Sequence, residues 1–228
     1  MHFGKNNPKK IYTMNNETLP TTVMERDLGV IITPQLNFKK HIDNCVKKAN
    51  RMIGLISRAF KNKSESVIKQ LYITIVRPYL DYCSPLWSPH AKGDIQRLER
   101  VQRRATKLVS TLRHLQYDDR LKALGLKTLE VRRKRQDLIQ LFKILKGEDY
   151  FPINEHFELQ NSSTRGHRLK LKKTTNNNDI SKHRYCSRII GAWNSLPSSL
   201  IEGTTKIEFI KKLDVYLETH DAPYFVND

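Results

Sequence analysis

The stretch that decides the fold is Leu98-Glu99-Arg100-Val101-Gln102-Arg103-Arg104-Ala105-Thr106-Lys107, near the middle of the 228-residue chain. Its apolar residues recur at steps of three and four, and its basic residues recur at the same steps on the other side. Because an α-helix turns once in 3.6 residues, this pattern turns one face to a core and the opposite face to solvent. The pattern extends over 91–112 and predicts a helix that points inward with Leu98, Val101, Ala105, Leu108 and Leu112.

Helical patterns also occur on both sides of this stretch. We expect helices over 37–60, 66–82 and 118–124, one from Thr128 to a stop at Gly147, and two after residue 180. The segment 66–82 is apolar on nearly all sides, which predicts the central buried element, with a kink at Pro78. The run 84–89 should end that helix because it contains two prolines. The last helix should open with a capping box, because Glu208 follows Thr205 by three residues.

The first 34 residues have a different pattern that favours β structure. Three short strands are expected at 10–14, 19–24 and 28–33, separated by turn residues and ended by Pro34. Strands of this size cannot close a core alone. Either helices cover them, or they are one edge of a larger sheet.

The composition is that of a globular, strongly basic protein. The chain has 41 Lys and Arg against 23 Asp and Glu, a formal net charge of +18, and 38% hydrophobic residues. No membrane-spanning run and no signal-peptide segment are present, which predicts an intracellular protein. Three widely spaced cysteines argue against a disulfide framework and against a zinc site, so reduced thiols are expected.

The basic residues gather on predicted helix faces opposite the apolar stripes. Such faces suit a polyanionic partner, because lysine and arginine bind phosphate oxygens, although a solvated helix face is the common alternative. The candidate nucleic-acid-binding residues are Lys40, Lys47, Arg51, Arg58, Arg97, Arg100, Arg103, Arg104, Lys107, Arg132 and Arg133. Among them, Arg97, Arg100, Arg104 and Lys107 are expected to form one outward ridge.

Motifs for catalysis or metal binding are weak. Asp118-Asp119 is reminiscent of a polymerase aspartate pair, but it opens a predicted helix, where acidic residues favour the positive end of the dipole. His183 and Cys186 are too few for a structural zinc site. No phosphate loop, nucleophile elbow or dinucleotide fingerprint occurs. The sequence therefore predicts no catalytic residue, no metal ligand and no cofactor.

Several short motifs occur together in a specific order along the chain. They are DLGV (27–30), LNF (36–38), HI (41–42), VRPYLDY (76–82), WSP (87–89), LERVQRRATK (98–107), LExRRxRxDL (129–138), RGH (165–167) and WNSLP (193–197). This series resembles the C-terminal part of the reverse transcriptase polyprotein of non-LTR retrotransposons of the jockey or CR1 type. The resemblance runs from about residue 12 to about residue 217.

The resemblance implies a fold and an order of domains. The expected fold is mainly α, a helical thumb-like bundle with a short N-terminal antiparallel β segment that is a remnant of a palm sheet edge. The expected segments are 1–34 (end of the palm-like region), 35–147 (helical thumb-like domain), 148–180 (loop or small hairpin connection) and 181–228 (C-terminal helical segment).

The resemblance also implies a function without catalysis. In that family of RNA-directed DNA polymerases the catalytic aspartates and the endonuclease domain lie upstream of the matched region. We therefore expect a truncated element product that is not an enzyme and binds RNA, DNA or an RNA–DNA hybrid, in the nucleus or cytoplasm, and that could associate with an intact element polymerase. The alternative is a protein-interaction helical module whose charge only keeps it soluble. An independent hydrolase or transferase has no supporting constellation.

Overall fold

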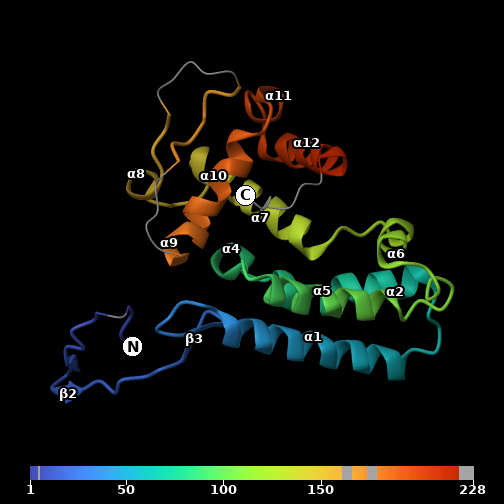
Figure 1. The fold of residues 1–228 in the computed structure, drawn as a ribbon, viewed down its shortest axis with the longest axis horizontal. Helices are drawn as coiled ribbons and strands as arrows, with labels where there is room; N and C mark the ends of the chain where they lie inside the picture. Colours follow the sequence, from blue (N-terminus) through green and yellow to red (C-terminus); the bar gives the residue numbers. More distant parts are fainter. Residues whose placement is uncertain (5, 161–165, 174–178, 221–228) are drawn as a thin grey trace. The chain divides into compact units, whose positions relative to one another are not determined.

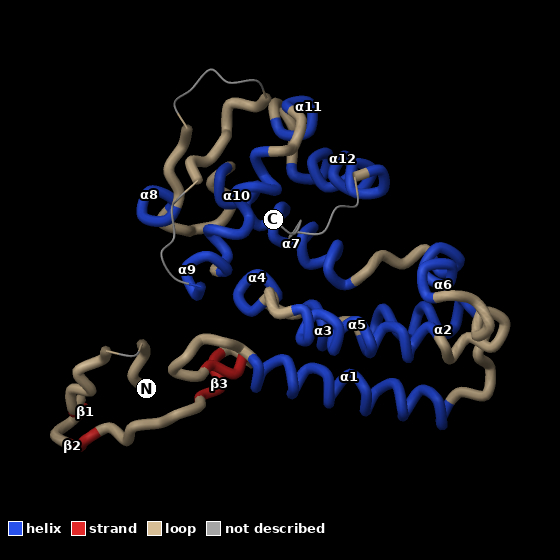
Figure 2. Tube along the Cα trace, in the orientation of Figure 1, coloured by secondary structure: helices blue, strands red, loops and turns tan. Residues whose placement is uncertain are grey.

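The computed structural model describes residues 1–4, 6–160, 166–173 and 179–220. It is mainly helical, with short antiparallel strands only near the N-terminus of the described chain (Figure 2). The expected class is therefore confirmed at this level. By its internal contacts the chain forms two compact units. The N-terminal unit comprises Met1–Cys83 and Ala91–Arg113, and the C-terminal unit comprises Ser84–His90 and the chain from His114 onward.

These units are composed differently from the predicted segments. The predicted thumb-like domain, 35–147, is divided between them, since 84–90 and 114–147 pack with the C-terminal helices. The reason lies in the helix that follows Thr128. It buries residues on several sides against helices from the end of the chain, and a contact of that kind is not visible in local periodicity.

Two separate β-hairpins form the N-terminal β segment. β1 (Thr13–Met14) pairs with β2 (Glu17–Thr18), and β3 (Glu25–Asp27) pairs with β4 (Val30–Ile32). The second hairpin turns through Leu28 and Gly29, both at positive φ, as a two-residue hairpin turn requires. The predicted strand over 19–24 is wrong. Pro20 lies within it and has no N–H to donate to a ladder.

The second hairpin is attached to helix α1 (Lys39–Ala59). Val30 is buried, and the backbone N–H of Ile31 donates to Nδ1 of His41 at 3.2 Å. The Tyr82 hydroxyl donates to the carbonyl of Leu28 at 2.8 Å. These two hydrogen bonds attach the hairpin to α1 and to the residue that follows α3 (Pro78–Asp81), while Leu28 in the turn stays exposed.

The apolar segment after α1 is interrupted before its proline. It consists of α2 (Glu65–Leu71), a π-helical turn η1 (Tyr72–Val76) and α3 (Pro78–Asp81), with Pro78 at the first position of the new helix. The predicted break at this proline is thus present as a π turn. The prediction that this segment is a fully buried central element is wrong. Only the stripe at steps of four is buried, namely Ile68, Tyr72, Val76 and Leu80, whereas Ile75 and Tyr79 are exposed.

The remaining helix of the N-terminal unit is α5 (Lys92–Thr106). It ends six residues before the predicted Leu112, and Val109 and Leu112 are buried in the turns that follow. Leu98, Val101 and Ala105 are buried as predicted, and Leu108 is partly exposed. The apolar spacing therefore continues into the core beyond the end of the helix.

The C-terminal unit is built around the long helix α7 (Leu129–Leu145), which contacts α4 (Ser84–Trp87), α10 (Tyr185–Asn194) and α12 (Lys206–Thr219) (Figure 1). Phe142 of α7 stacks on Phe209 of α12 with ring centroids 4.2 Å apart. The predicted capping box of Thr205 and Glu208 is confirmed. The run 84–89, expected only to stop a helix, forms α4. Shorter helices complete the unit: α6 (Tyr117–Leu124), α8 (Ile153–His156), α9 (Asp179–His183) and α11 (Ser198–Ile201).

The connection between α7 and α9 was predicted as a loop or a small hairpin. Its described residues contain one isolated antiparallel bridge, between Leu159 and Leu171. The side chain of Asn194 clamps Leu171, accepting from its N–H at 2.9 Å and donating to its carbonyl at 2.7 Å. Trp193 Nε1 donates to the carbonyl of Leu169 at 2.7 Å. Residues 161–165 and 174–178 of this connection, including Arg165 of the RGH motif, lie outside the described residues.

Each helix in the described parts of the chain is either too short or too polar to span a lipid bilayer.

Candidate nucleic-acid interface

Two parallel helices of the N-terminal unit, α1 and α5, place the basic residues. Arg97 of α5 donates to Asp43 of α1, and Arg104 donates to the side-chain oxygen of Asn50 at 3.0 Å. In each pair the partners are 54 residues apart in sequence. The two helices therefore run in the same direction and in register over about two turns.

Arg97 neutralises charge at the seam between these helices. It forms ion pairs with Asp43 and, at 3.2 Å, with Asp94. The hydrogen bond to Asp43 is the main reason that the pKa of Arg97 is raised above its ordinary value. Arg97 lies on the predicted ridge with Arg100, Arg104 and Lys107, but its charge is already paired within the protein. Asp43, which lies on another helix, occupies it.

The remaining candidates on these helices lie on one face of the pair. Residues of an α-helix are offset by about 100°, so Lys40, Lys47, Arg51 and Arg58 lie within about 90° of the seam residues of α1. Arg100 and Lys107 lie beside the seam residues of α5, but they are displaced from them around the helix axis in the opposite direction. Because the two helices are parallel and face each other at the seam, opposite displacements place the basic residues of both helices on the same side of the pair. We call this set the basic face: Lys40, Lys47, Arg51, Arg58, Arg100, Arg104 and Lys107.

The basic face is exposed and not neutralised. All seven side chains are exposed. Among the described residues none of the seven has a carboxylate within ion-pairing distance, and Arg104 bonds only to the neutral amide of Asn50. Lys40 and Arg58 are 18 residues apart, so the α1 stripe is about 27 Å long at 1.5 Å per residue. The seven cations therefore lie along one exposed face, and their charges are not paired with carboxylates among the described residues.

The other three candidates differ in position. Arg103 is exposed on α5, about 60° around the helix from Arg100 and about 40° from Lys107, so it flanks the basic face. Arg132 is partly buried on α7 of the C-terminal unit, and Arg133 beside it is only 1% exposed. A phosphate contact by Arg133 is therefore excluded by burial. The helix α7 is covered on several sides, so an arginine opposite one apolar stripe still faces protein.

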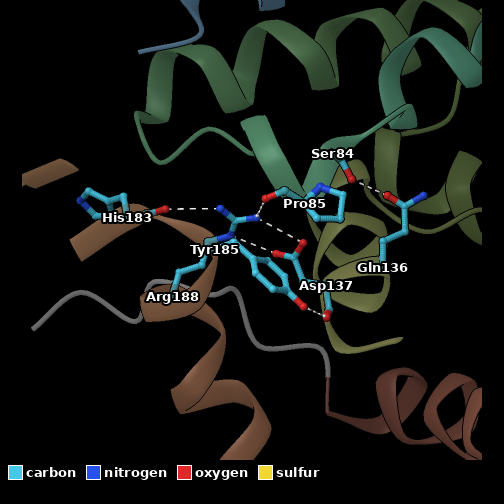
Figure 3. Close-up of polar contacts among 7 residues, drawn as sticks. All are labelled: Ser84, Pro85, Gln136, Asp137, His183, Tyr185 and Arg188. Atoms are coloured by element: carbon cyan, nitrogen blue, oxygen red, sulfur yellow. Dashed lines mark hydrogen bonds and ion pairs between the residues drawn. The ribbon is translucent and has the colours of Figure 1, made fainter. Parts of the chain in front are cut away.

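A buried ion pair in the C-terminal unit was missed in the sequence (Figure 3). Arg188 of α10 bonds both carboxylate oxygens of Asp137 on α7, at 3.0 and 3.2 Å, and donates to the carbonyl of Pro85 in α4 at 2.7 Å. The side chains of Arg188 and Asp137 are 4% and 0% exposed. The Tyr185 hydroxyl donates to the carbonyl of Asp137, and burial raises the pKa of Tyr185. This network joins three helices of the unit.

The buried histidine and cysteine of α1 are structural. Nδ1 of His41 accepts the Ile31 N–H, so its proton lies on Nε2, which faces Sγ of Cys45 at 3.3 Å. Burial lowers the pKa of His41 and raises that of Cys45 to about 11. Both groups are neutral near pH 7. They therefore lack the charge separation of a nucleophilic cysteine–histidine pair.

The structure also bears on the aspartate pair Asp118-Asp119 and on metal binding. Asp118 and Asp119 are exposed in the first turn of α6, which confirms that they open a helix. Within the described ranges, no three His, Cys, Asp or Glu side chains come together in a way that could hold a metal ion.

The sequence was compared with known proteins. The chain is similar to the uncharacterized protein B0403.1 of Caenorhabditis elegans, with 31% identical residues over 140 positions that cover 60% of this chain and 70% of that protein. No protein-family model and no solved structure matches this chain.

Proposed function

We propose a nucleic-acid-binding function for this chain, which belongs to the same family as the Caenorhabditis elegans protein B0403.1. In this proposal the chain corresponds to the thumb and the following helical region of a non-LTR retrotransposon reverse transcriptase. The ordered motifs from 27–30 to 193–197 support that relationship. The proposed partner is RNA, DNA or an RNA–DNA hybrid in the nucleus or cytoplasm. An intact element polymerase is a second proposed partner.

One observation carries the proposal: seven cations without a carboxylate partner share one face of a helix pair. Phosphate contact by such residues releases counterions, and this term dominates binding that is independent of sequence. The helices beneath are held by Ile42, Ala49 and Ile53 on α1 and by Leu98 and Val101 on α5, all buried. The charges are therefore presented on a packed support, which lowers the entropy lost on binding.

Binding by the basic face is tested by its dependence on salt. A filter-binding titration of the whole chain with a primer–template hybrid at several salt concentrations measures the slope of log affinity against log salt. Five phosphate contacts give a slope of about −3.5 to −4.5. Absence of binding at low salt, or a slope near zero, would contradict the proposal and favour the protein-interaction module.

We propose further that the chain has no polymerase activity of its own. The resemblance places the catalytic aspartates of the family upstream of the matched region, and Asp118 and Asp119 are exposed in the first turn of the partly buried helix α6. Primer extension by the purified chain, with magnesium or manganese, is expected to yield no product. Extension that disappears in Asp118→Asn would overturn this part of the proposal.

A further inference from the structure

A groove of about 540 Å³ opens between α11 and α12 in the C-terminal unit. Its apolar lining comes from Pro197, Leu200, Val215 and Tyr216, and two lysines, Lys211 and Lys212, also line it. Lys211, Lys212, Val215 and Tyr216 follow steps of one, three and one, which places them on one side of α12. Phe209, Leu213 and Leu217 on the other side are buried in the core. The groove is therefore a second, outward face of a helix that is already packed.

The apolar lining is exposed at Pro197 and Val215, whereas Leu200 is buried. Val215 is 66% exposed, although it is a branched aliphatic residue in the middle of a helix. Tyr216 is partly buried, and its ring stacks on His220 with centroids 4.3 Å apart. That stacking occupies one face of the tyrosine, which reduces its use as a platform for a nucleic-acid base. An apolar side chain, in contrast, gains by covering Val215 and Pro197, which are exposed.

The charge at the groove is one-sided because the acidic residues of α12 have other partners. Glu208 accepts from the backbone N–H of Thr205 at 2.9 Å, Asp214 pairs with Arg135, and Glu218 lies 4.0 Å from Lys127. Lys212 donates to the carbonyl of Ser199 at 2.9 Å, and no ion pair of Lys211 or Lys212 lies among the described residues. Hydrogen bonds from Thr205 lower the pKa of Glu208, and the charges of Lys212 and Lys211 lower it further, so this carboxylate is near both lysines. Two lysines against one carboxylate, whose oxygens bond Thr205, leave the groove with a net positive charge.

We propose that this groove binds an acidic amphipathic peptide segment of a partner protein. Apolar side chains of the segment cover Val215, Pro197 and Tyr216, and its carboxylates pair with Lys211 and Lys212. The arrangement is that of a helix-in-groove interface, in which apolar anchors give affinity and flanking charges give orientation. A phosphate backbone would satisfy the lysines but would leave the apolar lining uncovered. The proposal does not depend on the basic face, which belongs to the other unit.

The probe is a fluorescein-labelled helical peptide with Leu and Phe at helix-face spacing and Glu at the flanking positions. Binding to the whole chain is measured by fluorescence anisotropy. The double change Lys211→Glu with Lys212→Glu should weaken binding by about tenfold or more, because two attractions become repulsions. A peptide with Lys in place of Glu should bind this variant better than it binds the unchanged chain.

The chain offers a matched pair of variants for the apolar contact. Val215 and Ile207 are both aliphatic residues of α12 and are 66% and 68% exposed, but only Val215 lines the groove. Val215→Ser should lower the affinity for the peptide by about fourfold, whereas Ile207→Ser should change that affinity by no more than about twofold. Both variants should fold, because neither side chain is buried.

Three outcomes would overturn the proposal. The first is that the Glu peptide does not bind the unchanged chain. The second is that Val215→Ser and Ile207→Ser weaken it equally. The third is that an oligonucleotide displaces the peptide from the unchanged chain and itself loses affinity in the Lys211→Glu, Lys212→Glu variant, which would assign the groove to nucleic acid.

Discussion

The two units of the molecule use arginine in opposite ways. In the N-terminal unit, Arg100 and Arg104 of α5 project from a helix pair into solvent, whereas Arg97 of the same helix is neutralised by carboxylates. In the C-terminal unit, Arg188 is buried and its charge is matched within the protein by Asp137. The contrast teaches that net charge alone does not locate a binding surface. The helices that cover an arginine decide whether its charge is available to a partner.

The largest effect is expected from breaking the buried pair. Asp137→Ala leaves the Arg188 guanidinium buried without a counter-charge, which destabilises a protein by about 3 to 5 kcal/mol. Unfolding in urea measures this loss. The matched control is Asp214→Ala, which removes the partner of Arg135 from a pair with side chains 29% and 47% exposed. An exposed pair contributes about 1 kcal/mol or less, so equal losses in the two variants would contradict the contrast between units.

A smaller effect is expected from acid, through the buried histidine of each unit. Burial lowers the pKa of His41 in the N-terminal unit and of His167 in the C-terminal unit. Both histidines bind protons more readily in the unfolded chain, so the free energy of unfolding should fall as pH drops below the ordinary value of about 6.5. In His41→Asn the difference in unfolding free energy between pH 7 and pH 5 should shrink. His114→Asn, at an exposed histidine, should leave that difference unchanged. An undiminished difference in His41→Asn would show that His41 is not held neutral by the fold.

The smallest effect on stability is expected at the exposed seam. Asp43→Asn removes a carboxylate from a pair that is 40% and 35% exposed, at a cost of about 1 kcal/mol or less. It should increase affinity for a primer–template hybrid by about two- to fivefold, because the charge of Arg97 is then less neutralised. Filter binding at low salt measures the change. Weaker binding in Asp43→Asn would indicate that the seam itself, and not the surrounding charge, is needed for contact.

Much of the fold follows from local patterns in the sequence. The apolar spacing of Leu98, Val101 and Ala105, the capping box at Thr205 and the stop at Gly147 all have the predicted role. These features depend on residues within about two turns of one another, so a single chain segment contains the information.

The candidate site could be predicted only in part, because neutralisation and burial depend on distant residues. Arg97 and Arg100 have the same local pattern, but Asp43, 54 residues away, pairs with Arg97 alone. In the sequence, Arg133 has the same pattern as an exposed arginine opposite the apolar residues of a helix. It is buried because several helices cover α7. The basic residues of α1 and α5 lie on the same side only because the two helices are parallel and aligned by the two contacts at their seam. No local pattern contains that register.

The most direct test of the central claim compares two double charge reversals in hybrid binding. Arg100→Glu with Arg104→Glu, on the basic face, and Lys211→Glu with Lys212→Glu, on α12, each lower the formal net charge by 4, from +18 to +14. If the basic face binds phosphate, the first variant should lose about tenfold or more in affinity at low salt, and its salt slope should be shallower by about 1.8. The second variant should lose much less. Equal losses in the two variants would show that total charge, and not the α1–α5 face, determines binding.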